Sequence, residues 1–161
     1  VTKKMNVVME KIFIRPAKIK DLNTLLAFEQ ELIAFERPFD STLQSGRIHY
    51  YDIEKMITAS NIRLLVAQQN DEVIGSGYAR IESAKPYLLH HQHAYLGFMF
   101  VRATHRGVSI NKLIMDSLTA WVASKKITEL RLDVYEPNHA AINAYQKSGF
   151  IKHMVEMRKG L

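Results

Sequence analysis

The feature that most restricts the fold is a strand that leads through a basic loop into the strongest helix of the sequence. His90–Val101 (HHQHAYLGFMFV) is aromatic and almost continuously apolar, which is typical of a strand covered on both faces. Arg102–Gly107 is short and basic. Apolar residues then recur at helical spacing, namely Ile110, Leu113, Ile114, Leu118, Trp121 and Val122. This unit predicts a sheet with a helix packed on it.

The rest of the chain predicts a mixed α/β fold, with one sheet and helices on both faces. Alternating polar and apolar residues predict strands at Lys11–Pro16, Ile62–Gln68, Val73–Ile81, Glu129–Val134 and Phe150–Met157. Helical spacing and capping residues predict helices from Asp21 to about residue 35, over Tyr51–Ser60, and from Asn138 towards Gly149. The predicted order is β-α-α-β-β-β-α-β-α-β, and the strand-helix-strand crossover makes its two strands parallel.

Length and composition indicate one domain that folds without covalent or metal support. A chain of 161 residues is expected to form one domain, here over residues 10–161, after a flexible segment 1–9. The absence of cysteine excludes disulfides, thiolate metal sites and a cysteine nucleophile, and it fits a cytoplasmic location. No apolar run approaches the roughly 20 residues of a membrane helix, and we expect no signal peptide and no membrane partner.

The net charge of +6 favours a polyanionic partner, although a second interpretation is that it only aids solubility. Nucleic acid, an anionic membrane and a phosphorylated cofactor all meet this description. The lysines and arginines are spread along the chain, and nothing resembles a recognition helix or an aromatic stacking platform. We therefore expect no nucleic-acid partner.

Two segments carry candidate chemistry. A helix that begins after Arg102–Gly107 offers unpaired N–H groups and the positive end of its dipole, which together suit a phosphate. The alternative is an ordinary basic connection. In the second segment, Asn138 and Tyr145 are seven residues apart and so lie on nearly the same helix face. The alternative there is a capping asparagine and a core tyrosine.

Taken together, these segments resemble the GNAT superfamily of acyl-CoA N-acyltransferases over roughly residues 12–157. Ile14-Arg15-Pro16-Ala17 followed by Asp21-Leu22 is similar to the opening strand and helix of the family. Val101–Ile114 (VRATHRGVSINKLI) resembles its pyrophosphate loop, Q/R-x-x-G-x-G/A, with Arg106 at the first position. The closing signature N-x-x-A-x-x-x-Y-x-x-x-G-F is matched by Asn138, Ala141, Tyr145, Gly149 and Phe150.

The resemblance implies the GNAT fold, in which two parallel central strands splay apart, and acetyl-CoA as co-substrate. His90, His91 and His93 could suggest a metal cluster, but no carboxylate or cysteine completes a ligand set, so we expect no metal. The acetyl group would pass to a primary amine by direct attack in a ternary complex. A backbone N–H near Phe98 or Met99 would hold the thioester carbonyl. The residues implied to bind the cofactor are Phe98, Met99, Phe100, Val101, Arg106, Gly107, Val108, Ser109, Ile110, Asn111, Asn138 and Tyr145.

The chain departs from the family pattern in the phosphate loop. Ser109 stands where the family usually has glycine, and Asn111 stands where it has glycine or alanine. Glycine lets a backbone approach a pyrophosphate closely, whereas serine and asparagine suit the start of a helix. The alternative function is therefore a non-catalytic CoA-binding module of the same fold.

By its match to the family, Tyr145 is the expected general acid that protonates the leaving thiolate. The candidate bases are Glu36, Asp40 and His93, because the strand before Val101 holds no carboxylate. Glu36 is the leading candidate, as base or for amine recognition. The acceptor is a small-molecule or peptide amine. The exposed edge of the last strand and the aromatic residues Tyr50 and Tyr51 are candidate contacts for a homodimer.

Overall fold

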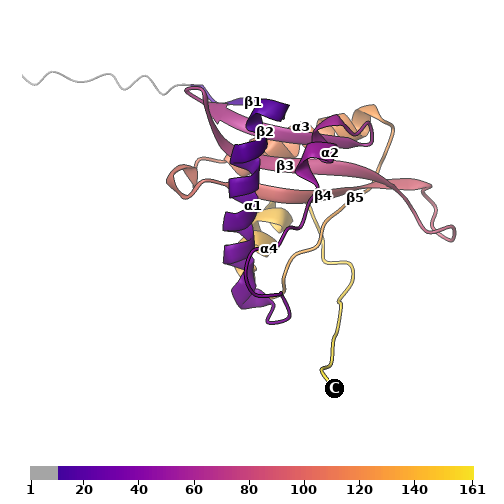
Figure 1. Ribbon diagram of the computed structural model, residues 1–161. Coiled ribbons are helices and arrows are strands. Elements are labelled where there is room, and N and C mark those ends of the chain that lie inside the picture. The colour runs from indigo at the N-terminus through magenta and orange to yellow at the C-terminus, as the bar shows by residue number, and fades with distance from the viewer. Residues whose placement is uncertain (1–10) are drawn as a thin grey trace, which may run out of the picture.

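The computed structural model describes residues 11–161, so the flexible segment predicted for residues 1–9 lies outside the described residues. Figure 1 shows a twisted sheet with helices on both of its faces. Its five strands follow the order β1-β2-β3-β4-β5, with β4 and β5 parallel and the other pairs antiparallel. The strands are β1 (Phe13–Pro16), β2 (Ile62–Gln69), β3 (Glu72–Ser83), β4 (Gln92–Val101) and β5 (Leu130–Arg131). The predicted mixed α/β class is confirmed.

The antiparallel half is built on a tight hairpin. Asn70 and Asp71 both have positive φ, 51° and 62°, as the two central residues of a type I′ turn require. The turn sets the register, with Gln69 opposite Glu72. The hairpin that the sequence predicted between β2 and β3 is therefore present.

One face of the sheet is covered by α1 (Leu22–Glu36) and α2 (Ile53–Thr58). The Phe28 ring of α1 packs against Phe100 of β4 with ring centroids 4.5 Å apart. Asp21 occupies the N-cap position of α1, and its carboxylate accepts hydrogen bonds of 2.8 and 2.9 Å from Arg15. The first strand and the first helix are thereby tied together.

The opposite face is covered by α3 (Ile110–Ser124), with α4 (His139–Lys147) beside it. The apolar residues of α3 recur at helical spacing and are buried against the sheet. They are Ile110, Ile114, Met115, Leu118 and Val122. Gly77 allows this close packing, because a Cβ there would lie 2.8 Å from Cγ2 of Ile114. Three short 3-10 helices complete the fold, at Ile19–Asp21, Arg37–Phe39 and Ala103–His105.

The strand predicted over Phe150–Met157 is wrong. Residues 150–161 have no regular secondary structure and run away from the sheet (Figure 1). A strand needs a partner for its backbone N–H and C=O groups, and none of the described strands pairs with this segment. Its apolar side chains Ile151, Met154, Val155 and Met157 are more than 80% exposed.

No helix within residues 11–161 is long and apolar enough to cross a membrane.

Candidate functional site

The two parallel strands separate soon after they meet. They pair at two positions, Ala94 with Leu130 and Tyr95 with Arg131. Beyond these pairs β4 continues to Val101, and the edge that faced β5 has no strand partner in the described part of the chain. This split explains why β5 is shorter than the predicted Glu129–Val134, and it confirms the splayed central strands.

A strained residue lies beside the split. Phe98 has a φ of +53° although its side chain is bulky and only 2% exposed. The register with β3 changes there, from Tyr78 opposite Gly97 to Ser76 opposite Phe100. One extra residue of β4 is thus accommodated as a bulge, which leaves a residue outside the regular ladder. Strain of this kind costs of the order of 1–3 kcal/mol and is concentrated at functional sites.

The loop after β4 leads to an open helix N-terminus. Gly107 and Ser109 both have positive φ, 85° and 62°, and Ser109 is the N-cap of α3. The Ser109 side chain makes no capping hydrogen bond, so it leaves the first N–H groups of α3 uncovered. Nε of Arg106 donates to the carbonyl of Val101 at 3.3 Å. The predicted loop residues therefore lie together at the end of β4.

Asn138 and Tyr145 bracket α4. The Asn138 carbonyl Oδ1 accepts a hydrogen bond of 3.3 Å from the backbone N–H of Ala141, so the asparagine caps the helix. The Tyr145 ring packs against the α3-side core and against Phe150, with centroids 5.8 Å apart. Burial, and then the charge of Glu36, raise the pKa of Tyr145. Its phenol therefore stays protonated at neutral pH.

Glu36 ends α1 among tyrosines. Burial raises the pKa of its carboxyl group, and the neighbouring Tyr50 hydroxyl opposes that rise. The negative charge of Glu36 also raises the pKa of Tyr135. The two residues predicted to be catalytic, Glu36 and Tyr145, are thus close enough to interact electrostatically.

Asp40 is already paired with a cation. Its Oδ1 lies 2.9 Å from Nη1 of Arg158, which also donates to Oγ1 of Thr42 at 3.0 Å. Hydrogen bonds from Thr42, with a smaller contribution from Arg158, lower the pKa of Asp40 to about 2. A carboxylate with so low a pKa is a weak proton acceptor.

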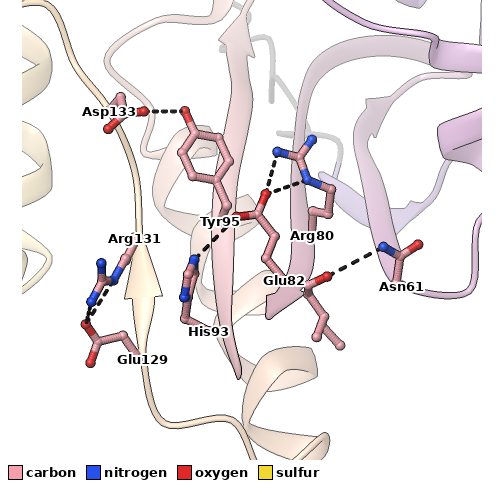
Figure 2. Close-up of polar contacts among 9 residues, drawn as sticks. Asn61, Arg80, Glu82, His93, Tyr95, Glu129, Arg131 and Asp133 are labelled. Carbon is pink, nitrogen blue, oxygen red and sulfur yellow. Dashed lines mark hydrogen bonds and ion pairs between the residues drawn. The ribbon is translucent and has the colours of Figure 1, made fainter. Parts of the chain in front are cut away.

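An open pocket of about 500 Å³ lies on the face of the sheet that carries α1 and α2. Neighbouring strands contribute most of its charged residues, among them Arg80, Glu82 and Arg131 (Figure 2). The segment before α2 contributes two tyrosines. The lining residues are Tyr50, Tyr51, Tyr78, Arg80, Glu82, His93, Tyr95, Arg131 and Asp133.

A buried carboxylate positions the tyrosine wall of this pocket. Glu29 of α1 is fully buried, and its Oε1 accepts the backbone N–H groups of Tyr50 at 2.7 Å and Tyr51 at 2.9 Å. Its Oε2 lies 2.8 Å from Nδ1 of His49. Sequence analysis did not single out Glu29, because only the folded chain brings its carboxylate to these N–H groups. The two tyrosines named for a dimer line the pocket instead, and the homodimer stays a prediction.

His93 in β4 and His90 just before it both lie close to carboxylates. Nε2 of His93 lies 3.3 Å from Oε2 of Glu82, and its Nδ1 is buried without a hydrogen-bond partner among residues 11–161. Nδ1 of His90 lies 3.8 Å from Oε2 of Glu129. Neither nitrogen of His93 is therefore open to a ligand in the pocket, although the side chain is part of the wall.

Asp133 is the functional candidate that sequence analysis missed. It lies two residues after the end of β5, and its Oδ2 accepts a hydrogen bond of 3.2 Å from the Tyr95 hydroxyl (Figure 2). No cationic side chain pairs with it in the described part of the protein. The alternation of Glu129–Val134 was a usable signal, since it puts Asp133 on the same face as Arg131.

Comparisons with known proteins agree with this geometry. The model of the acetyltransferase (GNAT) family matches residues 26–150. No curated protein matches the chain. A mutant of the BH1408 protein from Bacillus halodurans has a TM-score of 0.85 at 16% identity, over 92% of this chain and 99% of that one.

Two further solved structures share the fold. A predicted acetyltransferase from Clostridium acetobutylicum, solved with acetyl-CoA, has a TM-score of 0.68 at 19% identity, over 92% of this chain and 96% of that one. Glucosamine-6-phosphate N-acetyltransferase from Arabidopsis thaliana has a TM-score of 0.69 at 17% identity, over 94% of this chain and 99% of that one.

Proposed function

This chain belongs to the GNAT acetyltransferase family, and we propose that it transfers an acetyl group from acetyl-CoA to a primary amine. The amine attacks the thioester directly while both substrates are bound. The relative from Clostridium acetobutylicum was solved with acetyl-CoA, and the relative from Arabidopsis thaliana acetylates an amine. Both likenesses support the donor and the reaction type.

The observation that carries the proposal is the split between β4 and β5, with the left-handed Phe98 beside it. An unpaired strand edge offers N–H and C=O groups to an extended ligand, and the amide groups of pantetheine match such an edge. The bulge at Phe98 provides a backbone N–H, near Phe98 or Met99, for the thioester carbonyl. Such a contact stabilises the oxyanion that forms during acyl transfer.

The phosphate end of the donor fits the loop that follows. The N–H groups at the start of α3 have no capping side chain, and Arg106 adds positive charge nearby. Open N–H groups and a helix dipole together favour a pyrophosphate. The left-handed Ser109 adopts the backbone conformation for which glycine is usually needed, and this supports binding despite the departure from the family pattern.

The acceptor is proposed to enter the pocket on the α1 side. A free alkylamine has a pKa of about 10.4, so it must lose a proton before it can attack. Asp133 is our choice for the group that takes this proton, because its carboxylate lines the pocket without a cationic partner in the described residues. Glu36 is the alternative, since burial raises its pKa, but it does not line the pocket.

Tyr145 is the proposed acid. Asp133 first takes the ammonium proton and passes it to solvent. As the nitrogen–carbon bond forms and the carbon–sulfur bond breaks, Asp133 takes the second amine proton and the phenolic proton passes to the thiolate sulfur. The tyrosinate then regains a proton from solvent. The raised pKa of Tyr145 means only that the phenol carries a proton to donate at neutral pH; the role itself is proposed from the match of Tyr145 to the family signature. Asn138, which caps α4, keeps the helix that carries Tyr145 in place.

The test is a calorimetric titration of acetyl-CoA, combined with an assay of CoA thiol release in the presence of an amine panel. Arg106→Glu is expected to weaken acetyl-CoA binding at least tenfold. Lys85→Glu makes the same charge change on the exposed β3–β4 hairpin, and it is expected to leave binding intact. Absence of acetyl-CoA binding to the wild-type protein would contradict the proposed function.

A further inference from the structure

We infer that the amine acceptor also carries an anionic group, a carboxylate or a phosphate, which Arg80 and Arg131 bind in the pocket. This inference rests on the proposed function, and it names the substrate class of the same site. Acetylation would form an amide at one end of the acceptor while the anionic group at the other end stays unchanged.

The lining of the pocket disfavours a plain alkylamine. Its residues are four tyrosines, two arginines, two carboxylates and a histidine, and none of them is aliphatic. A hydrocarbon chain would therefore gain little from burial against this wall. Polar groups that converge on a pocket usually fix the orientation of a polar ligand.

Arg80 has hydrogen-bonding capacity left for a ligand. Its Nε and Nη2 lie 2.7 and 2.6 Å from the same oxygen, Oε1 of Glu82. Its guanidinium lies over the rings of Tyr78 and Tyr95, 5.6 and 5.5 Å from their centroids. The hydrogen bonds and ion pairs that Arg80 makes with carboxylates of residues 11–161 use Nε and Nη2 and not Nη1. In Figure 2 the dashed lines from Arg80 end on Glu82. Arg80 is therefore held in position while neither N–H donor of Nη1 binds a carboxylate of the described residues.

Arg131 repeats this arrangement on β5. Its Nε and Nη2 both lie 3.1 Å from Oε1 of Glu129, the contacts that Figure 2 draws. The side-chain hydrogen bonds and ion pairs of Arg131 with residues 11–161 do not use Nη1. Glu129 is not part of the pocket wall. Two guanidinium groups thus offer Nη1 donors to the same pocket, and carboxylates and phosphates are the ligands that such donors bind best.

Asp133 is the carboxylate of the pocket that we expect to bind the amine, in contrast to the two arginines. Its carboxylate accepts a hydrogen bond from Tyr95 but meets no cation among residues 11–161. An amine would bind there, beside the β4–β5 split, while an anionic group binds the two Nη1 groups. The pocket therefore complements a molecule with both charges better than it complements a simple amine.

The experiment compares acceptors that differ only in the anionic group. The carboxylate arm uses β-alanine against β-alaninamide, and the phosphate arm uses O-phosphoethanolamine against ethanolamine. Binding is measured by saturation-transfer NMR in the presence of CoA, which cannot react, and kcat/KM is measured with acetyl-CoA. We expect the anionic member of at least one pair to bind 10- to 100-fold more tightly, in line with a charge-assisted hydrogen bond of about 1.5–3 kcal/mol.

Arg131→Gln and Arg80→Gln are expected to remove that preference for the anionic member. Arg47→Gln, an exposed arginine outside the pocket, is the matched control and is expected to keep the preference. Equal binding of neutral and anionic members, no binding of any anionic probe, or a preference that survives both pocket variants would overturn the inference. Since thiol release and acetyl-CoA titration report the proposed function separately, the two failures are distinguishable.

Discussion

The Tyr95 hydroxyl donates a 3.2 Å hydrogen bond to Oδ2 of Asp133, across the point where β4 and β5 begin to separate. Burial, followed by the charge of Asp133, raises the pKa of Tyr95, so the phenol remains a donor at neutral pH. This contact fixes one carboxylate at the junction between the strand edge proposed for the cofactor and the pocket proposed for the amine.

Replacement of this carboxylate is expected to slow the reaction without affecting the donor. For Asp133→Asn we predict a kcat/KM lower by about 10²- to 10⁴-fold, the range typical of a lost acid–base group. The Kd for acetyl-CoA should be unchanged. Glu36→Gln is the comparison, measured by thiol release at several pH values. If Glu36→Gln shows the large loss and Asp133→Asn does not, Glu36 is the base.

Variants of Ser109 test whether the left-handed backbone at this position affects acetyl-CoA binding by the phosphate loop. Its φ of +62° is a conformation that glycine adopts without cost and that β-branched residues strongly resist. We expect Ser109→Gly to keep or raise the affinity for acetyl-CoA. Ser109→Val should destabilise the protein by about 1–2 kcal/mol and weaken that affinity. Urea unfolding and calorimetry measure both effects, and a tolerated valine would show that the loop conformation does not matter.

Gly77 tests the close packing of α3 on the sheet. A Cβ at this position would lie 2.5 Å from Sδ of Met99 and 2.8 Å from Cγ2 of Ile114. Gly77→Ala is expected to lower the free energy of unfolding by about 1–3 kcal/mol through overpacking. Gly160→Ala is the control, because a Cβ there would meet nothing within 4 Å. Equal unfolding midpoints for the two variants would refute the packing account.

Asp21 should make stability depend on pH in acid. Its hydrogen bonds with Arg15 are the main reason why the pKa of Asp21 in the folded state lies below its ordinary value of 3.8. A lowered carboxyl pKa stabilises the native state fully above the unfolded pKa, and this stabilisation is lost as the pH falls through the folded pKa. We expect Asp21→Asn to cost about 2–4 kcal/mol at neutral pH.

That cost should stay constant from about pH 5 to about pH 8 and shrink below pH 3.8. Asp116→Asn breaks an exposed pair with Lys112 and should change stability by no more than about 0.5 kcal/mol. Denaturant unfolding across this pH range is the measurement. A difference between wild type and Asp21→Asn that persists undiminished at the lowest pH is incompatible with this account.

Much of the fold could be predicted because its signals are local. The β2–β3 hairpin follows from Asn70-Asp71 between two apolar runs, and α3 follows from its regular apolar spacing. The prediction of a last strand over Phe150–Met157 was wrong because strand formation depends on a contact that is not local. The composition of Phe150–Met157 suits a strand, but a strand forms only where another strand supplies hydrogen bonds. The local pattern of residues does not show whether such a partner strand lies beside this segment.

The candidate site also has one part that could be predicted from the sequence and one part that could not. The phosphate loop is one continuous segment, so its predicted residues lie together. The acceptor pocket draws Tyr51, Arg80, Tyr95 and Asp133 from separate segments, and its polarity depends on which sheet face each strand presents. Alternation places Tyr78 and Arg80 on one face of β3, but it does not reveal that Asp133 faces the same space.

The most direct test of the central claim is detection of N-acetylated product by mass spectrometry, with acetyl-CoA, an amine panel, and either wild-type protein or Tyr145→Phe. The account predicts product with the wild type and a rate lower by about 10²- to 10⁴-fold with Tyr145→Phe, while both proteins bind acetyl-CoA equally. Acetyl-CoA binding without product from any amine would contradict it, and would identify the chain as a CoA-binding module without catalysis.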